Sequence, residues 1–213
     1  GASNGLQLPA VDMLGVPFGW CRGKGEWTAV MSAVAKGEDV EVIQECGSTL
    51  WQNHLPKLHP FKFNESPNTK AKIYITHKKN SLPLTTWHPR VLWVGIGCER
   101  GTSKQVIADA IDKVFQENQF SLSAIAGIAT IDIKSDEVGL LELCQERNLP
   151  LKTFPSEILN KITVPNPSEV VEKEVGTPSV AEAAAIDAAN QTNIASPKIA
   201  SLIVPKQIYR SPI

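Results

Sequence analysis

The sequence has no excess of charge of either sign, and this limits the partners that it can bind. Its 213 residues include 21 Lys and Arg against 22 Asp and Glu, which gives a formal net charge of -1. A protein that holds a nucleic-acid backbone needs a basic field to neutralise the phosphates. We therefore expect no nucleic-acid partner.

The chain also lacks long apolar runs and closely spaced cysteines. No stretch approaches the roughly 18 consecutive apolar residues of a membrane span, so we expect no membrane partner. The four cysteines are far apart, and their spacing fits neither a zinc pair nor the disulfide framework of a small secreted domain. We interpret Cys21, Cys46, Cys98 and Cys144 as free thiols of a cytoplasmic protein.

Tryptophan is absent from the second half of the chain, since all five tryptophans lie at or before residue 93. This uneven distribution indicates two small α/β domains. Residues 80–89 contain two prolines and follow no hydrophobic period, so we place the boundary there. The expected domains are residues 1–85 and 90–213, the second built on a mostly parallel sheet flanked by helices.

Hydrophobic periodicity predicts three elements in the first domain. Residues 26–36 should form a helix, because Trp27, Val30, Met31 and Val34 follow the i, i+3, i+4, i+7 pattern. Alternating apolar and polar residues predict strands at 40–44 and 72–77. The prolines and asparagines of residues 50–67 predict an irregular connection between these strands.

Strands and helices alternate in the second domain, which favours a parallel sheet. The apolar run 91–97 predicts a central strand covered on both faces. Residues 123–134 are ambiguous, although their end alternates as a strand does. In chain order, the other expected elements are a helix at 103–118, a strand-like segment at 130–134, a helix at 136–147, a strand at 149–154 and a last strand at 200–204.

Two capped helix starts stand out between residues 164 and 190. Asn166-Pro-Ser168-Glu combines a capping residue with Pro at the first helical position, and Thr177-Pro-Ser179 repeats this arrangement. The second helix is rich in alanine, which permits close backbone approach. Helix N-termini lined by these polar side chains are candidate sites for anionic groups.

The turn Gly95-Ile-Gly-Cys-Glu-Arg-Gly-Thr-Ser103 is the clearest candidate binding site. Glycines after a parallel strand let a ligand approach the N-terminus of the next helix. The spacing fits neither a dinucleotide fingerprint nor a P-loop. A tight turn without a ligand is an equally good interpretation. None of the histidines stands in a catalytic motif that could activate the thiol of Cys98. A packed or ligand-contacting thiol is therefore favoured over a nucleophile.

Lys134-Ser-Asp-Glu137 follows a predicted strand and precedes a predicted helix. The simpler interpretation is that Ser135 caps this helix and that the acids complement its dipole. An ammonium and two carboxylates on one loop are also suited to act as electrophile and base. His54 and His59 are interpreted as solvent-exposed, and no metal site is predicted.

Three segments resemble the CbiG family of cobalamin biosynthesis: residues 95–103, residues 129–139 (ATIDIKSDEVG) and above all residues 164–184 (VPNPSEVVEKEVGTPSVAEAA). The same segments resemble the related CobE protein. Residues 10–80 resemble the central region of CbiG, which CobE lacks. The resemblance therefore covers nearly the whole chain and favours the central and C-terminal domains of CbiG.

The resemblance implies a cobalt-precorrin-5A hydrolase, in which water opens the ring-A δ-lactone of a cobalt-corrinoid and releases acetaldehyde to give cobalt-precorrin-5B. No cofactor is expected, because the cobalt arrives inside the substrate. In this hypothesis Asp136 or Glu137 activates water and Lys134 stabilises negative charge. The substrate would be held by Gly95, Gly97, Cys98, Thr102, Ser103, Thr130, Asn166, Ser168, Thr177 and Ser179.

Two departures from the family leave alternatives open. Glu99 stands where the family turn commonly has Arg. A complete CbiG also has a further N-terminal domain, so we expect this chain to be a fragment, and whether it is active without that domain is left open. The first alternative is a corrinoid-binding or carrier module without catalysis. The second is a structural domain of a fusion with an adjoining precorrin methyltransferase.

Overall fold

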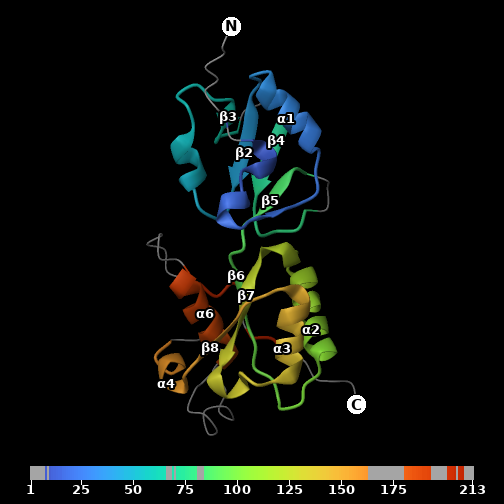
Figure 1. Ribbon diagram of the computed structural model, residues 1–213, viewed down its shortest axis with the longest axis vertical. Coiled ribbons are helices and arrows are strands. Elements are labelled where there is room, and N and C mark those ends of the chain that lie inside the picture. Colours follow the sequence, from blue (N-terminus) through green and yellow to red (C-terminus); the bar gives the residue numbers. More distant parts are fainter. Residues whose placement is uncertain are drawn as a thin grey trace. The chain divides into compact units, whose positions relative to one another are not determined.

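The computed structural model describes residues 8, 10–65, 69, 71–80, 84–162, 180–192, 201–204 and 206–208. Contacts between Cα atoms divide the chain into two compact units. Unit 1 comprises Gly1–Val91 and Gln119–Ala124, and unit 2 comprises Leu92–Asn118 and Ile125–Ile213. Each unit combines a β-sheet with helices, so the protein has the α/β fold that the sequence predicts (Figure 1).

Unit 1 contains a mixed five-stranded sheet with the strand order β1-β5-β4-β2-β3. These strands are β1 (Cys21–Arg22), β2 (Val40–Gln44), β3 (Phe61–Lys62), β4 (Ala71–Ile75) and β5 (Thr86–His88). All neighbouring pairs are parallel except β1 and β5. Unit 1 also contains helix α1 (Trp27–Ala35) and the short 3-10 turns Val11–Met13, Val16–Phe18, Leu50–His54 and Leu122–Ala124.

Buried tryptophans form the centre of the core of unit 1. Trp20, Trp27, Trp51 and Trp87 are all buried. The Trp87 indole N–H donates to the carbonyl of Val11 at 3.0 Å, and its ring meets that of Trp27 edge-on, with 5.5 Å between centroids. Large aromatic side chains contribute much of the apolar area that a small core can bury. The uneven distribution of tryptophan therefore marks the core of one unit.

The predicted helix and the two longer strands of unit 1 are confirmed, and Gly37 follows α1 with a φ of 69°. The prediction for residues 50–67 was wrong in part, because this segment contains a 3-10 turn and β3. Residues 80–89 include β5, which pairs with both β4 and β1. Strands of two or three residues are too short to leave a period in the sequence, which explains why neither β3 nor β5 was predicted.

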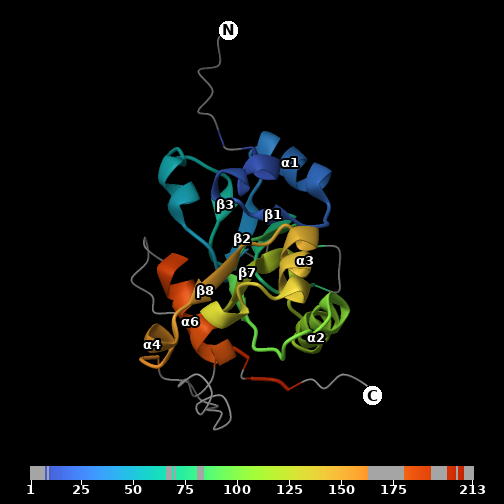
Figure 2. The ribbon, with the colours of Figure 1, turned by 60° about the horizontal axis from the view of Figure 1, so that its bottom comes forward.

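Unit 2 contains a three-stranded parallel sheet with the order β6-β7-β8. The strands are β6 (Leu92–Gly95), β7 (Ile125–Ile131) and β8 (Leu151–Phe154), and the helices are α2 (Lys104–Glu117), α3 (Val138–Arg147), α4 (Ser156–Leu159) and α6 (Val180–Thr192). Figure 1 and Figure 2 show α2 and α3 together on one face of the sheet and α6 on the other. The predicted parallel sheet flanked by helices is confirmed.

Four predictions for unit 2 need correction. β6 lies at an edge of the described sheet, and β7 is its central strand. Residues 132–134 form a 3-10 turn, not the end of a strand. The residue that precedes α3 is Glu137, not Ser135. Residues 201–204 do not form a strand, whereas the helix start expected at Asn166 lies outside the described residues.

The apolar character of β6 comes from α6, which lies against it. Ala183, Ala184 and Ala188 of this helix are at most 2% exposed. Their small side chains let the helix lie close to the sheet, as the alanine-rich sequence predicted. An apolar run in the sequence reflects this coverage and not the position of a strand within its sheet.

None of the helices in the described parts of the chain has both the length and the apolar character of a membrane span.

Candidate functional site

The carboxyl ends of β6 and β7 lie at the same edge of the unit 2 sheet. The two strands are parallel, and Gly95 pairs with Ala129 in their register. The segments that follow them, residues 96–103 and residues 132–137, therefore begin side by side. Ligands of open α/β sheets bind at this edge. The fold thus brings together two segments that the sequence offered as separate candidates.

Arg100 joins the two segments through a network of charged groups. Its Nη1 lies 2.6 Å from Oδ1 of Asp136 and 3.1 Å from Oε1 of Glu137. Its Nη2 donates to the carbonyl of Ile133. The backbone N–H of Gly101 donates to Oε2 of Glu137 at 3.3 Å. Both carboxylate oxygens of Glu137 therefore contact the glycine turn.

The two carboxylates of this network differ in exposure. The side chain of Glu137 is 5% exposed, whereas that of Asp136 is 75% exposed. The hydrogen bond from Arg100 and its positive charge lower the pKa of Asp136, and Asp136 in turn raises the pKa of Arg100. Asp136 is therefore an ionised carboxylate that faces solvent, while Glu137 holds the network from within.

Glycines let the two segments approach each other. A Cβ at Gly139, in the first turn of α3, would lie 2.2 Å from the carbonyl oxygen of Thr102. Gly101 has a φ of 80°, a conformation that glycine adopts without strain. A side chain at position 139 would therefore force the segments apart.

A hollow of about 370 Å³ opens where the two segments meet. Its lining includes Arg100, Asp136 and Glu137, the first turn of α2 at Ser103 and Lys104, and Val138 and Glu142 of α3. Lys104 forms an ion pair with Glu146 at 3.3 Å. The hollow therefore combines cations, a helix N-terminus and carboxylates, a set that suits a polar or anionic ligand.

The predicted hydroxyl residues of the turn make local hydrogen bonds. Thr102 donates to the carbonyl of Glu99 at 2.7 Å, and Ser103 Oγ accepts the N–H of Val106 and caps α2. Both residues line the hollow. Thr130 is fully buried and donates to the carbonyl of Ile96 at 2.6 Å, which ties the end of β7 to the turn.

The other residues predicted in the turn have different surroundings. Gly95 packs against Ala181 of α6, while nothing lies within 4 Å of the position that a Cβ would take at Gly97. Burial raises the pKa of the Cys98 thiol, and the charge of Lys134 opposes this rise. Cys98 is thus a protonated, half-buried thiol at neutral pH, which agrees with a packed or ligand-contacting role. Asn166, Ser168, Thr177 and Ser179 lie outside the described residues.

Arg100 is the residue of this site that sequence reasoning missed. Arg100 stands within the glycine turn, but no role was predicted for it. One signal was available: the turn contains a single cation, and the next loop contains adjacent carboxylates. Their contact depends on the pairing of β6 with β7, which the sequence does not display.

The described residues contain no group of three or more His, Cys, Asp or Glu side chains placed to hold a metal ion. The prediction that both loop histidines are solvent-exposed was wrong for one of them. His54 is exposed, whereas His59 is half-buried and its ring lies 6.0 Å from those of Phe61 and Phe63. All four cysteines are free thiols.

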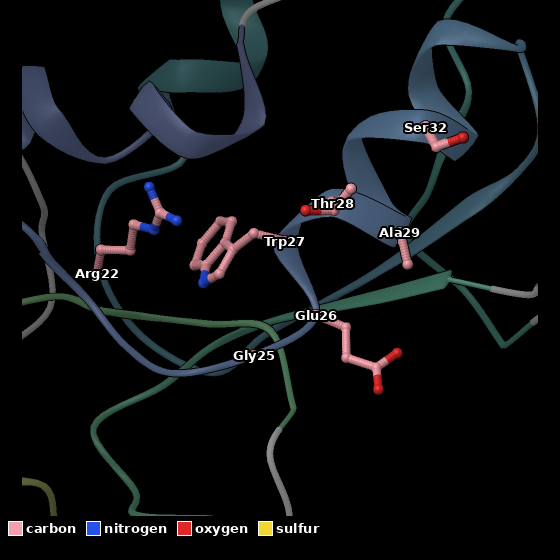
Figure 3. A pocket seen from close by; sticks show the side chains of 7 residues that line it. All are labelled: Arg22, Gly25, Glu26, Trp27, Thr28, Ala29 and Ser32. Atoms are coloured by element: carbon pink, nitrogen blue, oxygen red, sulfur yellow. The ribbon is translucent and has the colours of Figure 1, made fainter.

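A second hollow, of about 710 Å³, lies at the start of α1 in unit 1 (Figure 3). The guanidinium of Arg22 stacks over the ring of Trp27 at 4.5 Å. Thr28 and Ser32 line the same hollow, and the carboxylate of Glu26 points away from the ring in Figure 3. No residue of this hollow belongs to the predicted site. Fewer hydrogen bonds and ion pairs hold its polar side chains in place than hold those around Arg100.

Comparison with family models matches both parts of the chain. The model described as "Cobalamin synthesis G C-terminus" matches residues 92–211, and "Cobalamin biosynthesis central region" matches residues 9–93. Cobalt-precorrin-5A hydrolase of Priestia megaterium is 33% identical over 205 residues, which cover 87% of this chain and 54% of the relative. Its counterpart in Salmonella typhimurium is 28% identical over 152 residues, or 69% and 42% of the two chains.

A solved structure resembles part of the fold. It is CobE, described as a protein from the cobalamin biosynthetic pathway, with a TM-score of 0.52 and 30% sequence identity. The match covers 56% of this chain and 86% of CobE. This chain spans about half the length of the curated hydrolases that it matches.

Proposed function

Because this chain belongs to the CbiG family of cobalamin biosynthesis, we propose that it takes part in the hydrolysis of cobalt-precorrin-5A. In this reaction water opens the ring-A δ-lactone, acetaldehyde leaves and cobalt-precorrin-5B is formed. The 33% identity with the Priestia megaterium hydrolase carries the proposal, since it extends over 205 residues. Cobalt is part of the substrate in this proposal.

The reaction is assigned to the hollow around Arg100. Hydrolysis of a lactone needs a base that activates water and a positive group that stabilises the developing negative charge. Asp136 is the better candidate base, because its side chain is 75% exposed and that of Glu137 is 5% exposed. Lys134, whose charge acts on both Cys98 and Asp136, is the candidate for stabilising negative charge.

The size and charge of the hollow suit one edge of a corrinoid. Pockets of about 300–1,000 Å³ enclose drug-sized ligands. A corrinoid macrocycle is larger than such ligands. A hollow of about 370 Å³ would accept one pyrrole-derived ring with its side-chain carboxylates. Attraction must come from local cations and helix N-termini, because the formal net charge is -1. Thr102 and Ser103 remain candidate contacts for these carboxylates.

A second candidate function is a corrinoid-binding or carrier module without catalysis. One observation favours it: the likeness to CobE, of which 86% is covered. In this function the same hollow binds the corrinoid, while the groups that complete catalysis come from another domain.

One experiment separates the two functions. The purified chain is mixed with cobalt-precorrin-5A, acetaldehyde is followed through its reduction by alcohol dehydrogenase and NADH, and binding is followed in the visible spectrum. The full-length Priestia megaterium hydrolase is the positive control. Acetaldehyde from the chain supports the hydrolase, and a spectral change without acetaldehyde supports the carrier. If only the control responds, both functions are wrong.

A further inference from the structure

Asp136 occupies the solvent-facing side of Arg100, where a ligand in the hollow would meet the guanidinium. We propose that Arg100 binds a carboxylate of the substrate. In the free protein Asp136 occupies this position on Arg100, and the substrate carboxylate displaces it. The inference rests on the proposed function for the substrate class, a corrinoid with free side-chain carboxylates.

Arg100 is held by the fold on one side and left open on the other. Buried Glu137 and the carbonyl of Ile133 fix the guanidinium from within. Asp136 contacts it with one oxygen, Oδ1, at 2.6 Å. Because the side chain of Asp136 is 75% exposed, water competes for this ion pair and it contributes little to the stability of the fold. The protein can therefore lose this contact without unfolding.

The exchange conserves the charges around Arg100. The hollow already contains Glu137 and Glu142, so a further anion is repelled while Asp136 stays in place. If Asp136 moves into solvent, the incoming carboxylate replaces one negative charge with another on the same guanidinium. Arginine and carboxylate groups also fit each other through paired hydrogen bonds. Whether Arg100 binds the substrate carboxylate or Asp136 then depends on the other contacts that the ligand makes.

Exposed apolar residues close to Asp136 in the sequence are candidates for such contacts. Ile133 is 50% exposed and Val138 is 63% exposed, and they flank Asp136 in the sequence. Leu141, one helical turn after Val138, is 44% exposed. A corrinoid combines apolar ring surface with charged side chains, so it can cover these residues while one carboxylate reaches Arg100. A small carboxylic acid offers only the charge and would not displace Asp136 as effectively.

Displacement also changes Asp136 itself. While it is bound to Arg100, its pKa is lowered, which makes it a weak base. Once the substrate carboxylate takes its place, that lowering is lost and the pKa rises towards its usual range. The released carboxylate then lies beside the bound substrate with greater basicity. Binding of a correctly charged substrate would thus activate the base that acts on it.

The test compares two probes on the purified 213-residue chain. Dicyanocobyrinic acid has free side-chain carboxylates, and its heptaamide has the same ring with uncharged side chains. Dissociation constants are measured in the visible spectrum or by calorimetry. For Asp136→Asn we expect roughly tenfold tighter binding of the acid, because its competitor is gone, and for Arg100→Gln roughly tenfold weaker binding. The dissociation constant of the heptaamide should change by less than roughly twofold in both variants.

Glu142→Gln is the matched control, because Glu142 lines the same hollow and its replacement removes the same formal charge. A gain that is clearly larger in Asp136→Asn than in Glu142→Gln supports displacement from Arg100, because replacing Glu142 relieves only the general repulsion of an anion in the hollow. An equal gain in Glu142→Gln points to general electrostatics and overturns the inference, as does weaker binding in Asp136→Asn. Arg100→Lys keeps the charge without the planar fork and should bind with intermediate affinity. Circular dichroism checks that all variants are folded.

The outcome is independent of turnover. If the wild-type chain binds neither probe, or binds both equally, Arg100 is not a carboxylate receptor and the inference is wrong. Acetaldehyde release from cobalt-precorrin-5A judges the proposed function separately. A chain that binds the acid in the expected order but releases no acetaldehyde supports the inference and contradicts the hydrolase.

Discussion

Gly95, the last residue of β6, lies directly against the carbonyl oxygen of Ala181 in α6. A Cβ built on Gly95 would be 1.7 Å from that oxygen and 3.0 Å from the Cβ of Ala185. Real Cβ atoms do not approach a carbonyl oxygen so closely, so any other residue here must push the helix away. Glycine at this position therefore serves the packing of helix on sheet at the edge that carries the candidate site.

We predict that Gly95→Ala destabilises unit 2. The added methyl group meets backbone, which cannot move aside as a flexible side chain can, and overpacking of this kind costs about 1–3 kcal/mol. Urea unfolding followed by circular dichroism measures the change. The control is Gly97→Ala, two residues further on, where nothing lies within 4 Å of the added Cβ. An equal loss of stability in both variants would contradict the packing argument.

Sequence periodicity predicted the elements whose burial follows a regular spacing. The stripe that includes Ile107 and Ile111 gave α2, and the alternation in residues 40–44 gave β2. β3 and β5 were missed because strands of two or three residues leave no period. The position of β6 at an edge was missed because coverage by α6 makes its sequence resemble that of a central strand.

The candidate site was predictable only in pieces. Glycines and hydroxyls marked the turn at 95–103, and Lys134 with its neighbouring acids marked the second loop. Their contact through Arg100 depends on which strands are neighbours, and no spacing in the sequence encodes that. The same holds for Glu137 and Asp136, which are adjacent in sequence but opposite in burial, because Glu137 immediately precedes α3 and turns inward.

Gly139→Ala should loosen the contact between the two site segments. Its Cβ would lie 2.2 Å from the carbonyl oxygen of Thr102. We expect a loss of about 1–3 kcal/mol in stability and weaker binding of dicyanocobyrinic acid, because Arg100 and Glu137 are drawn apart. Gln145→Ala, at an exposed position of the same helix, should change neither quantity. Normal binding by a destabilised Gly139→Ala variant would contradict this role.

The stability of unit 1 should fall in mild acid because of His88. This residue is 8% exposed, and its Nδ1 lies 2.8 Å from the carbonyl of Thr76, so Nδ1 carries the proton of a neutral ring. Burial lowers the pKa of His88. Below about pH 6.5 the unfolded chain gains a proton that the folded chain does not, so the free energy of unfolding decreases as pH falls towards the lowered pKa.

The measurement compares urea unfolding at about pH 7.5 and about pH 5.5, followed by tryptophan fluorescence. Each pH unit within the window changes the contribution of one histidine by at most about 1.4 kcal/mol. His88→Asn keeps a donor near Thr76 and should reduce the pH dependence. His54→Asn, which replaces an exposed histidine of the same unit, should leave it unchanged. His77, whose pKa burial also lowers, contributes to the pH dependence that remains.

Asp136→Asn should separate binding from turnover in a protein that hydrolyses cobalt-precorrin-5A. The amide no longer competes for Arg100 as an ion, so KM should not rise. It cannot accept a proton from water, so kcat should fall by about 10²-fold or more, the usual contribution of a general base. Lys134→Ala should also lower kcat, because positive charge beside the developing oxyanion is lost. Ser135→Ala changes the exposed residue between them and should retain wild-type kinetics. Acetaldehyde release at the wild-type rate from Lys134→Ala and Asp136→Asn would show that neither residue has the role assigned to it.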